Sequence, residues 1–232
     1  MIFQKNRYFQ ISSVSSNRLV TGNALAFIAI FLFAAGFPAA EVLLEIWHPI
    51  TLMFFRLLLA VSTLVTIWLL LEGLPSVLKA PWLKGIKIGL FGFGLGTNLL
   101  LFAQWFTDPI TVALLVTLVP ISATILEVWD GRRKLNTKFI FGLLASIIGG
   151  FIAVSENISI NLGWGGLMAL ASGFCFMWAS DKSVTKLPEL SSIARSSITF
   201  TGATVFTTIS FLVFFNLGLI EIPNRITNGQ LF

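Results

Sequence analysis

Residues Trp47 to Leu59 form the stretch WHPITLMFFRLLL, which places one arginine, Arg56, in an otherwise apolar segment. The apolar character continues to about residue 71, and a helix needs about 20 apolar residues to cross a bilayer. Six further runs contain no charged residue and are also long enough to cross as helices. These runs are Leu19 to Ala40, Ile88 to Thr107, Pro109 to Leu126, Phe139 to Ser155, Asn157 to Ser180 and Ser196 to Ile220.

The composition agrees with a membrane-embedded chain. Of 232 residues, 56% are hydrophobic and 11% are charged, whereas soluble domains average about 25% charged residues. We therefore predict an all-α, polytopic transmembrane helix bundle that lies in a lipid bilayer. The seven expected spans are roughly 20–44, 49–71, 86–106, 109–129, 138–155, 161–180 and 194–219.

The positive charges indicate how the spans are oriented. The net charge is +5, but the basic residues do not form one patch, so nucleic acid is not expected as a partner. Lysine and arginine occur before the first span and in the gaps after spans two, four and six, and are missing from the gaps after spans one, three and five. By the positive-inside rule we expect a cytoplasmic N-terminus, in a chain of the cytoplasmic membrane.

Metal and cofactor chemistry has little support in the sequence. Cys175 is the only cysteine and lies in an apolar run, so neither a disulfide framework nor a cysteine-based zinc site is expected. No nucleotide-binding motif is found, and we expect no cofactor.

An internal similarity predicts an inverted repeat. An arginine follows a proline by seven residues in PITLMFFR (Pro49 to Arg56) and again in PELSSIAR (Pro188 to Arg195), at the starts of spans two and seven. We expect residues 20–155 to form one repeat of five spans and residues 161–232 to form part of a second. An odd number of spans inverts the second copy, as in many transporters, and on this interpretation the chain is truncated near its C-terminus.

Four segments resemble the drug/metabolite transporter superfamily, specifically its EamA-type members. They are FLFAAGFPAAE (Phe31 to Glu41), HPITLMFFR (His48 to Arg56), ALLVTLVPISATIL (Ala113 to Leu126) and FIFGLLASIIGGFIAV (Phe139 to Val154). The resemblance covers residues 20 to about 220. It implies a carrier for small metabolites whose full form has ten spans.

Five polar residues within or near the spans are candidates for substrate binding: Arg56, Glu41, Asn98, Gln104 and Arg195. An arginine at the centre of a transmembrane helix costs about 2.5–3.5 kcal/mol on insertion scales. Arg56 therefore either extends to the interface or holds an anionic group in a water-filled cavity. For Asn98 and Gln104 the alternative is an interhelical hydrogen bond, and for Glu41 it is a solvated helix end.

Two stripes of small residues predict close helix packing. Gly85, Gly89, Gly92 and Gly96 share one face of span three, at the spacing that lets transmembrane helices approach closely. A second stripe in span five consists of Gly142, Ser146 and Gly149.

The leading hypothesis for function is a secondary transporter, or permease, that moves a small metabolite such as an amino acid by alternating access. A truncated chain that is inactive or depends on a partner is the alternative, and either a second copy or a second chain would then complete the bundle. An enzyme is not expected, because His48 is the only histidine and few groups converge on it. A retinal protein is not expected either, because the seventh span contains no lysine for a Schiff base.

Overall fold

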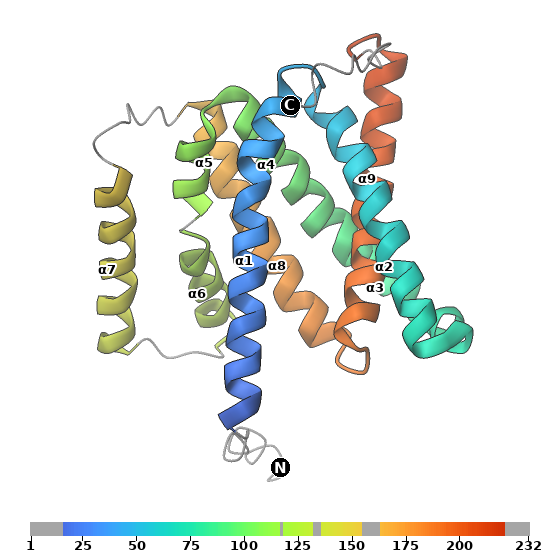
Figure 1. Cartoon of the computed structure of the whole chain (residues 1–232), viewed down its shortest axis with the longest axis horizontal. Helices are drawn as coiled ribbons and strands as arrows, with labels where there is room; N and C mark the ends of the chain where they lie inside the picture. The colour runs from blue at the N-terminus through green and yellow to red at the C-terminus, as the bar shows by residue number, and fades with distance from the viewer. Residues whose placement is uncertain (1–15, 117, 132–135, 155–162, 221–232) are drawn as a thin grey trace. The chain divides into compact units, whose positions relative to one another are not determined.

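A computed structural model describes residues 16–116, 118–131, 136–154 and 163–220 (Figure 1). The described residues form helices and no strand, which confirms the all-α fold. The elements are α1 (Ser16–Leu44), α2 (Pro49–Lys79), α3 (Trp82–Ile88), the π-helical η1 (Gly89–Gly94), α4 (Leu95–Phe106), α5 (Pro109–Val116), α6 (Val119–Trp129), α7 (Thr137–Val154), α8 (Trp164–Lys186) and α9 (Ser192–Asn216). Five segments of the described chain are long and apolar enough to cross a membrane: Val20–Leu44, Pro49–Lys79, Trp82–Phe106, Pro109–Trp129 and Ser192–Asn216.

The chain divides into two compact units, residues 1–39 and residues 40–232. In the first unit, α1 exposes an uninterrupted run of side chains from residue 20 to residue 35. Most of them are apolar, and they include Phe27 and Phe31, which are 73% and 67% exposed. Lipid tails can cover such a surface while the helix satisfies its own backbone hydrogen bonds. This part of α1 therefore has the properties of a membrane span.

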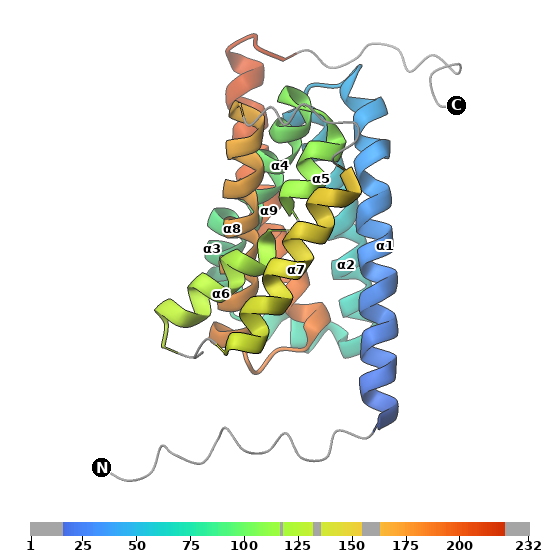
Figure 2. The same cartoon turned by 90° about the vertical axis from the view of Figure 1, so that its left-hand side faces the viewer.

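The second unit is a bundle in which successive spans run in alternate directions (Figures 1 and 2). α2, α5–α6 and α8 run one way, and α3–η1–α4, α7 and α9 run the other way. Helix α9 packs against α2 and along α3 and η1, while α8 packs against α4. Helix α7 lies at the edge of the unit, beside α5. The π-helical segment η1 of the third span therefore lies between α8 and α9.

The two ends of this bundle differ in charge. We call the end where α2 and α8 finish and α9 begins the basic end, because its described lysines include Lys79, Lys84, Lys87, Lys182 and Lys186. The described loops at the opposite end, residues 45–48, 107–108 and 217–220, contain no lysine or arginine. The alternation expected from the sequence is thus present in space, while Arg132 to Lys134 lie outside the described residues.

Local chemistry sets the helix boundaries. The ring nitrogen Nδ1 of His48 accepts a hydrogen bond from the backbone N–H of Ile50 (3.3 Å) and caps α2. Gly73 then interrupts α2 with a backbone φ of 79°, a conformation that glycine adopts without a Cβ penalty. Ser191 caps α9 by accepting from the N–H of Ala194 (3.2 Å), and Gly218, with φ 68°, follows its end.

Two features of the spans differ from the sequence prediction. The sequence predicted one helix over residues 109–129, whereas the structure has α5 and α6, the second of which has Pro120 in its first turn. Proline has no N–H to donate and its ring clashes with the carbonyl four residues earlier, so it favours a helix start over a helix interior. In addition, α8 continues past the end expected at residue 180. It ends at Lys186, and the residues beyond the apolar run include charged ones.

Candidate functional site

Glycines on the third span allow α9 to approach it closely. A Cβ atom added to Gly85 would lie 3.0 Å from the Cβ of Ile198, and one added to Gly89 would lie 2.6 Å from the backbone carbonyl carbon of Thr199. Real Cβ atoms essentially never lie closer than 3.0 Å to another heavy atom. The contact of α3 and η1 with α9 therefore depends on the missing side chains, as at other small-residue interfaces in membranes.

The next two glycines of the same stripe face a different helix. A Cβ on Gly92 would contact the Cβ of Ala179, and one on Gly96 would lie 3.2 Å from the Cβ of Cys175, both on α8. The stripe expected on a single face is therefore divided between two neighbours. The π-helical turn η1 contains Gly89 and Gly92, one glycine of each pair, and a π turn inserts an extra residue that rotates the following residues relative to an α-helix.

The stripe on α7 makes no such contact in the described structure. Gly142 and Gly149 are exposed, and nothing lies within 4 Å of a Cβ built on either of them. Ser146 lies in the same helix. The packing role of this stripe therefore stays a prediction. It would require neighbours outside this unit.

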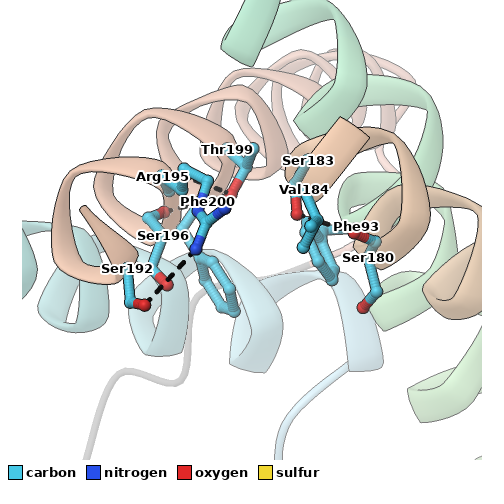
Figure 3. Close-up of a pocket in the computed structure, with 9 residues that line it drawn as sticks. All are labelled: Phe93, Ser180, Ser183, Val184, Ser192, Arg195, Ser196, Thr199 and Phe200. Carbon is cyan, nitrogen blue, oxygen red and sulfur yellow. Dashed lines mark hydrogen bonds between the residues drawn. The ribbon is translucent and has the colours of Figure 1, made fainter. Parts of the chain in front are cut away.

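A cavity of about 240 Å³ lies at the basic end, between α8, α9 and η1 (Figure 3). One wall is on α9 and the other is on α8, with one aromatic ring contributed by η1. We call it the Arg195 cavity, and its lining residues are Phe93, Ser180, Ser183, Val184, Ser192, Arg195, Ser196, Thr199 and Phe200. Of the residues proposed from the sequence, only Arg195 lines it.

The polar lining consists of one guanidinium group and five hydroxyl groups. Arg195 is half-buried, and its Nη2 donates to the Oγ of Ser192 over 3.4 Å. The hydroxyl of Thr199 donates to the backbone oxygen of Arg195 (2.8 Å), and that of Ser183 donates to the backbone oxygen of Ser180 (2.9 Å). These two hydroxyl oxygens still have lone pairs that can accept a hydrogen bond.

The sequence analysis did not identify these hydroxyl groups. Their signal on α9 is the spacing of Ser192, Ser196 and Thr199 around Arg195, which places all four on one helical face. Ser180 and Ser183 on α8 carry no comparable local signal, because only the packing of α8 on its neighbours brings them to the cavity.

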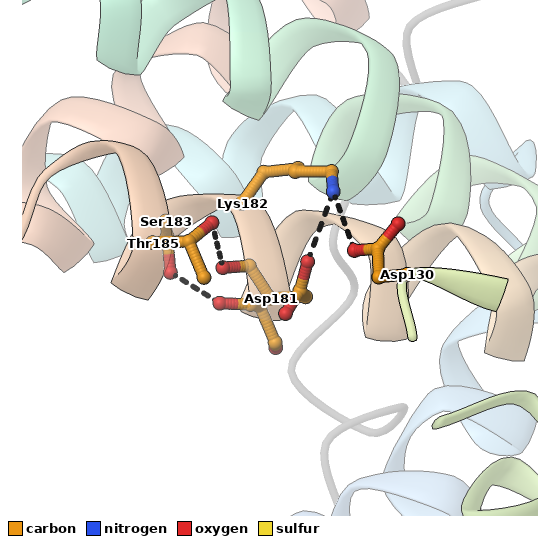
Figure 4. A network of polar contacts seen from close by, with 6 residues as sticks. Asp130, Asp181, Lys182, Ser183 and Thr185 are labelled. Carbon is orange, nitrogen blue, oxygen red and sulfur yellow. Dashed lines mark hydrogen bonds and ion pairs between the residues drawn. The ribbon is translucent and has the colours of Figure 1, made fainter. Parts of the chain in front are cut away.

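Beside the cavity, an ion-pair network joins Lys182 to two acidic side chains near the end of α8 (Figure 4). The Nζ of Lys182 lies 3.3 Å from the Oδ2 of Asp130 and 3.1 Å from the Oδ2 of Asp181. This pairing joins the end of α6 to α8. It also confirms that residues 130 and 182 lie at the same end of the bundle.

The structure places Arg56 and Glu41 far from this cavity in the fold. Arg56 is exposed on α2, three residues before Leu59, which is 71% exposed. Glu41 is exposed in the last turn of α1, and no ion pair joins it to Arg56 in the described part of the chain. Both residues lie toward the end opposite to Arg195, because they are near the end of α1 and the start of α2.

Asn98 and Gln104 lie on α4. The Nδ2 of Asn98 donates to the backbone oxygen of Gly94 (2.8 Å) and to the Oγ1 of Thr207 on α9 (2.6 Å), so Asn98 makes an interhelical hydrogen bond. Its Oδ1 and the Oε1 of Gln104 are buried without a partner among the described residues. Each of these oxygens can still accept a hydrogen bond.

His48 connects three spans at the end opposite to the Arg195 cavity. Its ring lies edge-on to Trp105 (4.9 Å between centroids) and to Phe102 (5.8 Å), and it is tilted against Phe214 of α9 (5.9 Å). Partial burial lowers the pKa of His48 below its ordinary value of 6.5. The neutral ring is therefore favoured, which agrees with Nδ1 accepting a hydrogen bond from Ile50.

Among the described residues, no group of three or more His, Cys, Asp or Glu side chains is arranged to hold a metal ion. No curated protein and no solved structure matches the chain. A family model, the EamA-like transporter family, matches residues 20–155. This range covers more than half of the chain and contains the whole of the first expected repeat. The chain therefore belongs to the EamA-like transporter family, a family of membrane transporters for small solutes.

Proposed function

We propose that the chain is a secondary transporter that moves a small organic metabolite by alternating access. The observation that carries this proposal is the pairing of α2 with α9. An arginine follows a proline by seven residues near the start of each helix, although Pro49 is the first residue of α2 whereas Pro188 lies in the loop before α9. The two helices run in opposite directions and pack against each other (Figure 1). Two antiparallel copies of one unit are the arrangement in which many carriers alternate access to a shared site.

Solute flux is the direct test. We expect purified protein in liposomes, without ATP, to catalyse saturable counterflow of at least one radiolabelled solute from a panel of amino acids and small organic acids. Protein-free liposomes are the control. Flux that requires ATP, or no counterflow with any solute of the panel, would contradict the proposal. A rate per protein that rises with protein density would indicate that two copies work together.

We further propose that the basic end faces the cytoplasm, in the cytoplasmic membrane. Glu45 and Glu189 are both exposed and lie at opposite ends of the bundle. Glu45 follows α1, and Glu189 precedes α9 at the basic end. With the lone Cys175 changed to serine, we expect Glu45→Cys to react with an impermeant maleimide in intact cells. Glu189→Cys should react only after permeabilisation, and the reverse pattern would overturn the orientation.

A further inference from the structure

We propose that the Arg195 cavity binds a small monocarboxylate with an apolar body, as the substrate site at the basic end of the transporter. This inference rests on the proposed function and adds a substrate class to it. It is argued from the charge, the hydrogen-bonding groups and the walls of the cavity (Figure 3).

The cavity has one positive charge that the described structure does not neutralise. None of its nine lining residues is acidic, and no described carboxylate pairs with Arg195. The nearby acids Asp130 and Asp181 both pair with Lys182 (Figure 4). An anionic ligand would pair with this guanidinium group through charge-assisted hydrogen bonds, which are stronger than those between neutral groups.

The hydroxyl groups supply the remaining donors for a carboxylate. Those of Ser183 and Thr199 donate to backbone oxygens, whereas those of Ser180 and Ser196 have no hydrogen-bond partner in the described structure. The guanidinium group can bind both oxygens of a carboxylate. The hydroxyl of Ser196, on the same wall of the cavity as Arg195, can donate a further hydrogen bond to it (Figure 3). A phosphate dianion would need a second cation, and the lining contains only one.

The cavity also offers an apolar surface. Phe93 and Phe200 stack with their ring centroids 5.3 Å apart and an interplanar angle of 27°, and Val184 lies beside them. The lining contains no acidic group for a substrate ammonium. The volume of about 240 Å³ is below the range of about 300–1,000 Å³ typical of drug-sized ligands. A molecule of the size of benzoate is therefore the expected class of substrate.

The test is equilibrium binding of radiolabelled benzoate to the purified full chain in lipid nanodiscs. We expect saturable binding that unlabelled benzoate displaces and that the neutral isostere benzamide does not. Arg195→Ala should weaken binding at least roughly tenfold, because a charge-assisted bidentate contact is lost. Arg195→Lys should recover part of it, and Ser196→Ala should weaken it by about fivefold through one lost hydrogen bond.

Lys186→Ala is the matched control, since it removes an exposed charge from the same end of the bundle without altering the cavity lining. Its affinity should equal that of the unchanged protein. Equal competition by benzamide, tighter binding of phenylalanine or phosphate than of benzoate, or undiminished binding in folded Arg195→Ala would each overturn the inference. Because binding is measured without transport, flux of another solute would leave the proposed function standing, and benzoate binding without flux would leave this site standing.

Discussion

Replacing Gly89 by alanine is expected to disrupt the packing of α9 against η1 and to lower the melting temperature of the protein strongly. The added methyl group would overlap the backbone of Thr199, with the carbonyl carbon 2.6 Å and the Cα 2.9 Å from the new Cβ. A side chain can rotate away from such an overlap, but a helix backbone has to move as a whole. Overpacking of a core usually costs about 1–3 kcal/mol, and a clash with backbone should reach or exceed the upper value.

Size-exclusion chromatography in detergent, after heating to a series of temperatures, measures this loss. Gly142→Ala on α7 is the matched control, because nothing lies within 4 Å of its new Cβ. Alanine favours a helix over glycine by up to about 1 kcal/mol, so this control should be as stable as the unchanged protein or slightly more stable. An unaltered melting temperature for Gly89→Ala would show that η1 and α9 are not as close as the structure places them.

A glycine on α9 also allows the close contact between α9 and the third span. A Cβ on Gly202 of α9 would lie 2.9 Å from the Cα of Ile86 on α3. Two glycines from opposite helices thus border one interface, and Thr199, which Gly89 contacts, also lines the Arg195 cavity. The spacing between α9 and the third span therefore also determines the shape of the proposed substrate site.

Five of the seven expected spans correspond to segments of the described chain that are long and apolar enough to cross a membrane. They were predictable because the thickness of the bilayer imposes a minimum apolar length. The expected start of span two at residue 49 agrees with α2, where Pro49 follows the His48 cap. The interruption near Pro120 was not predicted, because the whole segment over residues 109–129 is apolar enough to cross as one helix. Hydropathy reports the length of a span and is insensitive to breaks in its backbone.

The site was less predictable than the fold, since tertiary packing assembles it. The spacing of Arg195 from Pro188 identified a candidate residue but gave no information on its neighbours. Ser180 and Ser183 reach the cavity only because α8 packs beside the third span. Arg56, which follows its proline at the same spacing, is exposed on α2 instead. The same sequence spacing therefore leads to different surroundings for the two arginines.

Replacing Trp68 by alanine is the second change for which we expect a large loss of stability. Trp68 is fully buried at the basic end, where its ring lies 5.7 Å from that of Trp82 and belongs to one cluster with Ile198 of α9. Removing a buried tryptophan typically costs about 3–5 kcal/mol. Lipid is as apolar as a protein core, so we expect the cost here to come from lost contacts and a cavity, at about 3 kcal/mol.

Trp68→Phe separates packing from hydrogen bonding. The indole Nε1 donates to the Oε2 of Glu72 (3.1 Å) and to the Oγ of Ser76 (3.3 Å). Phenylalanine keeps a ring in the cluster, while Glu72 still accepts from Ser76 (2.8 Å). Trp68→Phe should therefore lower the free energy of unfolding by only about 1 kcal/mol. Trp129→Ala, at a site that is 85% exposed, should leave the melting temperature unchanged. If Trp129→Ala destabilised the protein as much as Trp68→Ala, the burial of Trp68 would not explain its effect.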